Sequence, residues 1–336
     1  MTNPTTRAVR TLAVTALALL ALTPATAATA ADDPAAIAAT AFDQRLAGDV
    51  DQAVATLEAG LETNPDAGIL HYELARTRMY LLEIDPMLEA AEAAVQSDPT
   101  NNEYRYFAAM AAGYGLIDAA HQQDTERMRF LGERCFDHLE ANLANNPSDN
   151  RSRCLLVEMH MNMAPEIGYQ VEGTEEHVAV LERNDPVLGA KARAALAGED
   201  ASVDIWKKLV AQRPEDCRAL AEAADGLVAA GELALAQDCL DKAIGKNKQH
   251  CYGLLRLGLA YAMRGDTEAA LALTDRYLAT DPPVALRAFA IGRKGVLQRR
   301  SGDREQGDLL MAEARALDPH VWLTVMPPPR EIFTSL

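Results

Sequence analysis

The stretch that decides the fold spans residues 251–282 and reads CYGLLRLGLAYAMRGDTEAALALTDRYLATDP. The apolar and small residues of its first half recur with the i, i+3, i+4, i+7 spacing of one helix face: Leu254, Leu257, Gly258 and Tyr261. Gly265-Asp266 interrupts this pattern, and Asp281-Pro282 ends it, because proline lacks the N–H that a helix interior needs. The stretch therefore predicts two helices joined by a tight turn.

Similar breaks recur along the chain at a regular distance. Pro65 and Pro99 are 34 residues apart, and Pro214 and Pro282 are 68 residues apart, which is twice that distance. Lys248 stands where the intervening proline would fall. A period of 34 residues built from two helices and a glycine turn is typical of the tetratricopeptide unit.

The stretch 251–282 resembles the tetratricopeptide repeat (TPR) family in more than its period. A small residue at Gly258 lets the second helix pack close to the first, and Ala270 is the small residue that faces it. The resemblance covers most of residues 33–319 and implies an all-α fold, an α-solenoid that forms a right-handed superhelix of about eight helix-turn-helix hairpins. We expect the best repeats at 34–67, 68–101, 217–250, 251–284 and 288–321.

Two segments depart from the regular pattern. Residues 102–216 form an irregular middle, where we expect longer helix pairs or a real loop, for which 163–173 is the best candidate. The tail at 320–336 contains Pro327-Pro328-Pro329, which predicts extended, polyproline-like chain. This tail either packs over the end of the solenoid or protrudes as a ligand.

The first thirty residues differ from all that follow. Arg7 and Arg10 precede an apolar run at 11–22 that is too short to span a hydrocarbon core of about 30 Å. Small residues then follow in the A-x-A pattern that signal peptidase cleaves. We expect 1–30 to be a cleaved signal peptide and the protein to be exported to the periplasm, or alternatively secreted. A noncleaved membrane anchor is the other interpretation, and the sequence predicts no transmembrane segment after cleavage.

Composition and charge exclude several classes of protein. Hydrophobic residues make up 49% of the chain, enough to build a core, so general disorder is excluded. The net charge is −17, or −19 once the two arginines of the signal are removed, which argues against nucleic acid and favours protein partners, including basic ones. Sequence motifs of phosphate-binding loops, serine hydrolases and zinc proteases are missing, so we expect no enzyme activity and no cofactor.

The TPR resemblance implies that the first helix of each hairpin lines a concave groove that binds a peptide or a helix of a partner. Carried over to the second and third units, the groove positions are Tyr72, Arg76, Met79, Tyr80, Tyr106, Met110 and Tyr114. Tyrosine and methionine offer large, adaptable contact area. The alternative is that several of these side chains fill the core between hairpins. A basic pair in the last unit, Arg299 and Arg300, is either a further partner contact or a solvated end cap.

A second candidate site lies in the irregular middle. Met159, His160 and Met163 could hold copper, because thioether sulfur and imidazole suit copper(I). The alternative is a core-facing helix, because Met159 and Met163 continue an apolar stripe. Among the five cysteines, we expect a disulfide between Cys239 and Cys251, which lie at similar heights on neighbouring antiparallel helices, and buried free thiols otherwise.

These observations predict a non-catalytic, exported TPR scaffold or adaptor that binds a protein or peptide in its concave groove. Two alternatives remain open from the sequence. One is a periplasmic copper-handling protein, and the other is a TPR accessory subunit of an envelope assembly or transport complex.

Overall fold

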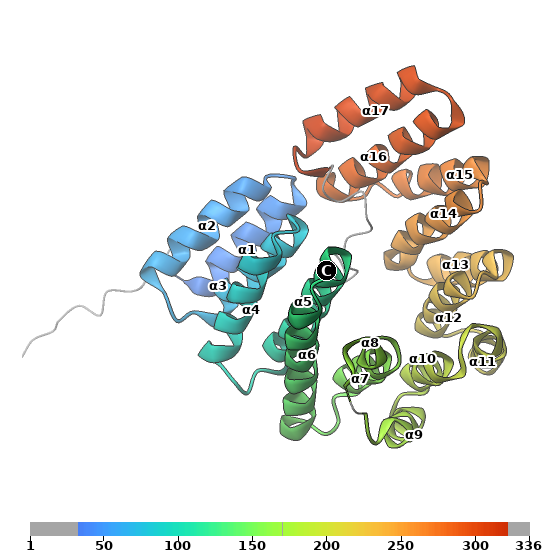
Figure 1. Ribbon diagram of the computed structural model, residues 1–336. Helices are drawn as coiled ribbons and strands as arrows, with labels where there is room; N and C mark the ends of the chain where they lie inside the picture. The colour runs from blue at the N-terminus through green and yellow to red at the C-terminus, as the bar shows by residue number, and fades with distance from the viewer. Residues whose placement is uncertain (1–32, 170, 322–336) are drawn as a thin grey trace, which may run out of the picture.

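The computed structural model describes residues 33–169 and 171–321, and all regular structure within them is helical. The helices form antiparallel hairpins that stack into an all-α solenoid, as Figure 1 shows. In chain order the hairpins are α1 (Pro34–Leu46) with α2 (Val50–Thr63), α3 (Gly68–Tyr80) with α4 (Ile84–Ser97), α5 (Asn102–Gln122) with α6 (Thr125–Asn145), α7 (Asn150–Asn162) with α9 (Thr174–Asn184), α10 (Pro186–Ala197) with α11 (Glu199–Gln212), α12 (Cys217–Ala229) with α13 (Leu233–Lys246), α14 (Gly253–Met263) with α15 (Thr267–Leu278), and α16 (Val284–Ser301) with α17 (Arg304–Leu317). The predicted all-α solenoid of TPR-like hairpins is confirmed.

Acidic and amide residues start many of these helices. The side chains of Asn101, Asp149 and Asp216 accept hydrogen bonds from backbone N–H groups in the first turns of α5, α7 and α12. Such caps satisfy N–H groups that have no partner within the helix. The Asp-Pro and Asn-Pro breaks of the sequence thus end one helix shortly before a capped start of the next.

The hairpin of α14 and α15 shows why the deciding stretch needs its small residues. A Cβ atom at Gly258 would lie 3.4 Å from the carbonyl oxygen of Ala270 and 3.6 Å from Cβ of Leu273, so a methyl group there would already be in van der Waals contact with α15. Thr274 is buried and donates to the Ala270 carbonyl oxygen at 2.8 Å. Close packing of the two helices therefore depends on this pair of small residues.

In the irregular middle, the third hairpin is longer than its neighbours. Helices α5 and α6 each contain 21 residues, against 13 and 14 in α3 and α4. After α7, the short α8 (Ala164–Ile167) interrupts the connection to α9. Another short element, the 3₁₀ helix η1 (Lys248–Tyr252), precedes α14.

The solenoid curves until its last hairpin contacts its first (Figure 1). The Tyr80 hydroxyl of α3 donates to the carboxylate of Asp318, the residue that follows α17 and is fully buried. His320 Nε2 lies 2.9 Å from Asp51 Oδ1 of α2. Gly48 sits in the turn of the first hairpin with φ 88°, and a Cβ atom there would lie 2.5 Å from the Leu317 carbonyl oxygen. The described hairpins therefore form a closed ring.

A buried set of charges supports the first two hairpins next to this closure. Arg45 of α1 is 1% exposed and donates to Glu73 at 3.2 Å and to the Thr77 hydroxyl at 2.8 Å. Arg76 donates to the other carboxylate oxygen of Glu73 at 2.6 Å. Burial lowers the pKa of Arg45 to about 10, so the guanidinium stays charged at neutral pH. Removing either partner would leave a buried charge unpaired, which would strongly destabilise the fold. The packing of the first two hairpins therefore depends on these ion pairs.

Replacing Tyr80 with phenylalanine tests the ring closure. The ring of the side chain stays, but the hydroxyl that donates to Asp318 is lost, and a hydrogen bond to a charged group contributes about 1.5–3 kcal/mol. We expect the contact between the first and last hairpins to open more often. Hydrogen–deuterium exchange should then be faster than in the wild type at residues 318–321 and at Gly48.

Tyr261→Phe is the matched control, because its half-buried hydroxyl lies 3.4 Å from Gln237 on α13, away from the closure. It should leave exchange at 318–321 unchanged. Equal exchange of 318–321 in Tyr80→Phe and in the control would show that this hydrogen bond does not hold the ring closed.

Candidate functional site

The side chains predicted to line a groove in the second and third hairpins lie inside the molecule. Six of them are less than a tenth exposed, and the seventh is half-buried against the same core; they are Tyr72, Arg76, Met79, Tyr80, Tyr106, Met110 and Tyr114, in that order. The structure therefore corrects their predicted exposure. They hold adjacent hairpins together, the alternative that the sequence left open.

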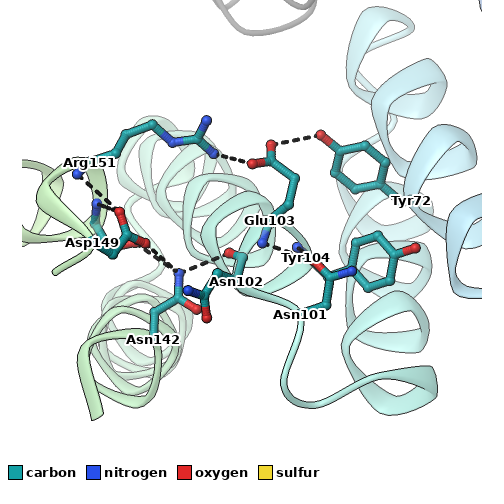
Figure 2. A network of polar contacts seen from close by, with 9 residues as sticks. Tyr72, Asn101, Asn102, Glu103, Tyr104, Asn142, Asp149 and Arg151 are labelled. Atoms are coloured by element: carbon teal, nitrogen blue, oxygen red, sulfur yellow. Dashed lines mark hydrogen bonds and ion pairs between the residues drawn. The ribbon is translucent and has the colours of Figure 1, made fainter. Parts of the chain in front are cut away.

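Tyr72 shows how these side chains are used, and Figure 2 shows its surroundings. Its hydroxyl donates to Glu103 of α5 at 2.9 Å, and Arg151 of α7 donates to the other oxygen of the same carboxylate at 2.7 Å. The Tyr72 ring also packs against Phe107 with ring centroids 5.3 Å apart. The guanidinium of Arg151 lies 3.7 Å from the centroid of the Tyr106 ring, a cation–π contact. Side chains of three successive hairpins thus meet in one network.

Asn142 of α6 lies beside this network and joins the third hairpin to the fourth (Figure 2). Its buried amide Nδ2 donates to the Asn102 carbonyl oxygen at 2.9 Å and to the Ser152 hydroxyl at 2.8 Å. It also lies 3.3 Å from Asp149, the N-cap of α7. One side chain therefore fixes where α5 and α7 begin relative to α6.

The predicted basic pair lies apart from these residues, near the end of α16. Arg299 and Arg300 are both exposed. Arg299 Nε lies 3.3 Å from Asp308 Oδ1 of α17, an exposed ion pair of small energetic value. As partner contacts, these arginines stay a prediction.

The Met and His residues of the candidate copper site face different surroundings. Met159 is buried in the main core, and Met163, the residue that follows α7, is partly buried against it. His160 is buried, with Nδ1 3.1 Å from the Thr174 hydroxyl, and burial followed by the proximity of His177 lowers its pKa to about 4. In residues 33–169 and 171–321, no group of three or more His, Cys, Asp or Glu side chains is placed to hold a metal.

The five cysteines are all free thiols in the structure, so the predicted disulfide between Cys239 and Cys251 is wrong for this fold. Cys239 is buried in the core, whereas the half-buried Cys251 Sγ accepts from the Thr280 hydroxyl at 3.6 Å. Burial raises the pKa of the Cys135 and Cys154 thiols to about 12. These two side chains are inert core groups at neutral pH.

A cavity of about 470 Å³ opens beside the start of α14, and we call it the α14 pocket. Its walls come from helices α12 to α16, from η1 and from the segment between α15 and α16. The lining includes Asp225, Tyr252, Arg256, Tyr277, Pro282 and Leu286. The pocket volume is that of an ordinary ligand site.

Beside the pocket, regular α-helix begins later than in the other hairpins, because the 3₁₀ helix η1 precedes α14. At the other 34-residue boundaries a proline sets the start of the next helix, but here Lys248 takes its place. Asn247 accepts from the Gln249 N–H at 3.0 Å, as Asp98 and Asn146 do at their boundaries, but here a 3₁₀ helix follows and regular α-helix begins only at Gly253. Lys248 and Gln249 are exposed at the edge of the pocket.

Two tyrosines form the aromatic part of the α14 pocket. The rings of Tyr252 and Tyr277 meet edge to face, with centroids 6.2 Å apart. Burial raises the pKa of Tyr252 to about 12 and raises that of Tyr277 as well, so both phenols are protonated at neutral pH. The pocket thus combines aromatic surface with neutral hydroxyl groups.

The polar side of the α14 pocket is an ion pair between neighbouring first helices. Arg256 Nη1 of α14 donates to Asp225 Oδ2 of α12 at 2.8 Å, and both side chains are half-buried. Apolar walls with a few placed polar groups are suited to binding and orienting a ligand. Sequence reasoning missed this site, although Lys248, which stands where a proline is expected, lines it.

Comparisons with known proteins add no relative in sequence: no family model and no curated protein matches the chain. Solved structures with a similar arrangement include a thermophilic TPR protein of Thermus thermophilus, at 17% identity and a TM-score of 0.44, covering 68% of this chain and 100% of that one. A tetratricopeptide repeat protein of Parabacteroides merdae is 16% identical, with a TM-score of 0.43, and the match covers 73% of this chain and 92% of that one. PilF of Pseudomonas aeruginosa is 15% identical, with a TM-score of 0.35, and the match covers 83% of this chain and 97% of that one.

Replacing Asn142 with alanine tests the network of Figure 2. The change removes the two hydrogen bonds that this buried amide donates to the Asn102 carbonyl and the Ser152 hydroxyl, and at about 0.5–1.5 kcal/mol each they contribute about 1–3 kcal/mol together. We expect the free energy of unfolding, measured by urea titration, to fall by about that amount.

Asn145→Ala supplies the control on the same helix, because Asn145 is exposed and makes only a long 3.4 Å contact with the Pro99 carbonyl oxygen. It should change the unfolding free energy by less than about 0.5 kcal/mol. Similar losses in the two variants would contradict the assigned role of Asn142.

The depressed pKa of His160 predicts a pH dependence of stability. In the unfolded chain this imidazole takes up its proton near pH 6.5, whereas in the folded chain it does so only near pH 4. The unfolded state therefore binds more protons between these values, and stability falls as the pH falls from 7 to 5. His160→Asn should make this fall smaller, as measured by urea titrations at the two pH values.

His121→Asn, at an exposed position on α5, should leave the same fall unchanged. If His160→Asn loses as much stability between pH 7 and pH 5 as the wild type does, another group carries the dependence.

Proposed function

We propose that this protein is a non-catalytic scaffold that binds an extended segment of a partner protein in the α14 pocket. The TPR-type fold is typical of protein-interaction scaffolds. The observation that carries the choice of site is the pocket itself, which is lined by aromatic and proline side chains and edged by Arg256 and Asp225. It takes the place of the groove expected in the second and third hairpins.

The chemistry of the pocket favours a peptide over a highly charged ligand. Tyr252 and Tyr277 provide apolar ring surface together with hydroxyl groups that can pair with backbone N–H and C=O groups. Arg256 is already neutralised by Asp225, so a ligand phosphate or carboxylate would have to compete with that ion pair. An uncharged extended segment meets no such cost.

The charge of the chain indicates which kind of partner is favoured. The chain carries 49 acidic against 32 basic side chains, which supports a basic or neutral protein partner and not a nucleic acid. No helix in the described part of the chain is long and apolar enough to cross a bilayer. We further propose export to the periplasm on the basis of the signal-like residues 1–30, which lie outside the described residues.

Site-specific photo-crosslinking tests the proposed site. A benzophenone amino acid in place of Gln249, which is exposed at the edge of the pocket, should yield an adduct with a partner protein in the native cells. The same amino acid in place of Glu268, exposed on α15 and outside the pocket, should not yield that adduct.

A second change links the adduct to the pocket and not to its surroundings. Tyr252→Ala removes half of the aromatic pair and should reduce the yield of the Gln249 adduct by about tenfold, the effect of losing about 1.4 kcal/mol of binding free energy. An adduct that persists with Tyr252→Ala, or that forms equally from Glu268, would show that the pocket is not the binding site.

A further inference from the structure

We propose that the proline run Pro327-Pro328-Pro329 of this chain's own tail docks in the α14 pocket and that a partner must displace it. The inference rests on the proposed function in one respect, namely that the pocket accepts an extended segment. It adds the identity of the first occupant, which belongs to the same molecule. The tail beyond Val321 lies outside the described residues.

The chemistry of the pocket matches a proline segment. Polyproline chain carries no internal hydrogen bonds and is recognised by grooves lined with aromatic rings, which pack on its flat pyrrolidine faces. The α14 pocket offers the edge-to-face pair Tyr252 and Tyr277, with Leu240 and Leu286 as further apolar wall. Because proline lacks an N–H, the run leaves no backbone donor unpaired when apolar walls cover it.

The position of Val321 brings the tail within reach of the pocket. Val321 is buried, and its side chain lies 3.8 Å from the place where a Cβ atom of Gly292 would be, in the middle of α16. Leu286, which lines the pocket, is six residues earlier on the same helix, or about 9 Å along its axis. Pro327 follows Val321 by six residues, which span about 19 Å in the polyproline conformation. This length covers the distance along α16 and the path around the helix.

A short connection makes weak docking effective. A tethered segment experiences an effective concentration of about 1 mM, so a dissociation constant of about 0.1 mM keeps it docked for about nine tenths of the time. A partner that uses the same pocket must displace the tail, so its apparent affinity for the pocket is reduced. The tail would act as a built-in competitor that admits only segments that bind more tightly.

Cys251 makes the occupancy measurable in the full chain. Its half-buried thiol lines the α14 pocket, while Cys217, also half-buried, opens α12 outside the pocket and serves as an internal reference. The experiment measures the rate of N-ethylmaleimide alkylation at each cysteine by peptide mass spectrometry on the purified protein. The test variant changes Pro327, Pro328 and Pro329 together to serine, and the matched control changes Thr334 and Ser335 to alanine.

If the prolines dock, the serine variant should alkylate Cys251 about tenfold faster relative to Cys217, following from nine-tenths occupancy. The control should behave as the wild type does, and a synthetic peptide of residues 322–336 should restore protection of the serine variant. Continued inertness of Cys135 and Cys154, which are buried with raised pKa, shows that the fold is intact.

Two results would overturn the proposal. One is an unchanged ratio of the Cys251 and Cys217 rates in the serine variant. The other is protection that disappears on dilution, because it would place the tail of a second copy in the pocket. The assay contains no partner, so failure of the photo-crosslinking experiment and failure of this one are separate outcomes.

Discussion

The buried carboxylate of Asp318 connects the two ends of the solenoid, and the shape of the molecule depends on it. In a stack of hairpins each unit contacts only its neighbours, so the first and last units normally leave a face uncovered. Here the Tyr80 hydroxyl donates to Asp318, and the Gly48 turn lies against the carbonyl of Leu317. The end faces cover each other, and small changes in the curvature of any hairpin act on this contact.

Contacts between adjacent hairpins explain why the tyrosine and methionine side chains of α3 and α5 are buried. The second and third hairpins lie between neighbours that supply hydrogen-bond partners, as Glu103 does for Tyr72, and Asp318 at the ring closure does so for Tyr80. Scarce aromatic residues clustered in one region look like a binding surface in the sequence. Whether the hydroxyl of Tyr80 meets a partner protein or a residue 238 positions away is not encoded in local spacing.

The fold itself was predictable because its determinants are local. The 34-residue period, the Gly258 and Ala270 contact and the proline breaks each act within one hairpin, so helix spacing is enough to identify them. The ring closure and the α14 pocket depend on contacts between hairpins. The pocket still left one trace, because Lys248, which stands where a proline is expected, begins the 3₁₀ helix at its edge.

Helix α16 takes part in both the ring closure and the α14 pocket. Leu286, near its first turn, lines the α14 pocket, while Gly292 in its middle lies beside Val321, and the same helix contacts α1 across the closure. A rigid helix transmits a displacement at one end to the other, because its side chains are packed on both sides. The α14 pocket and the ring closure therefore share one packed helix.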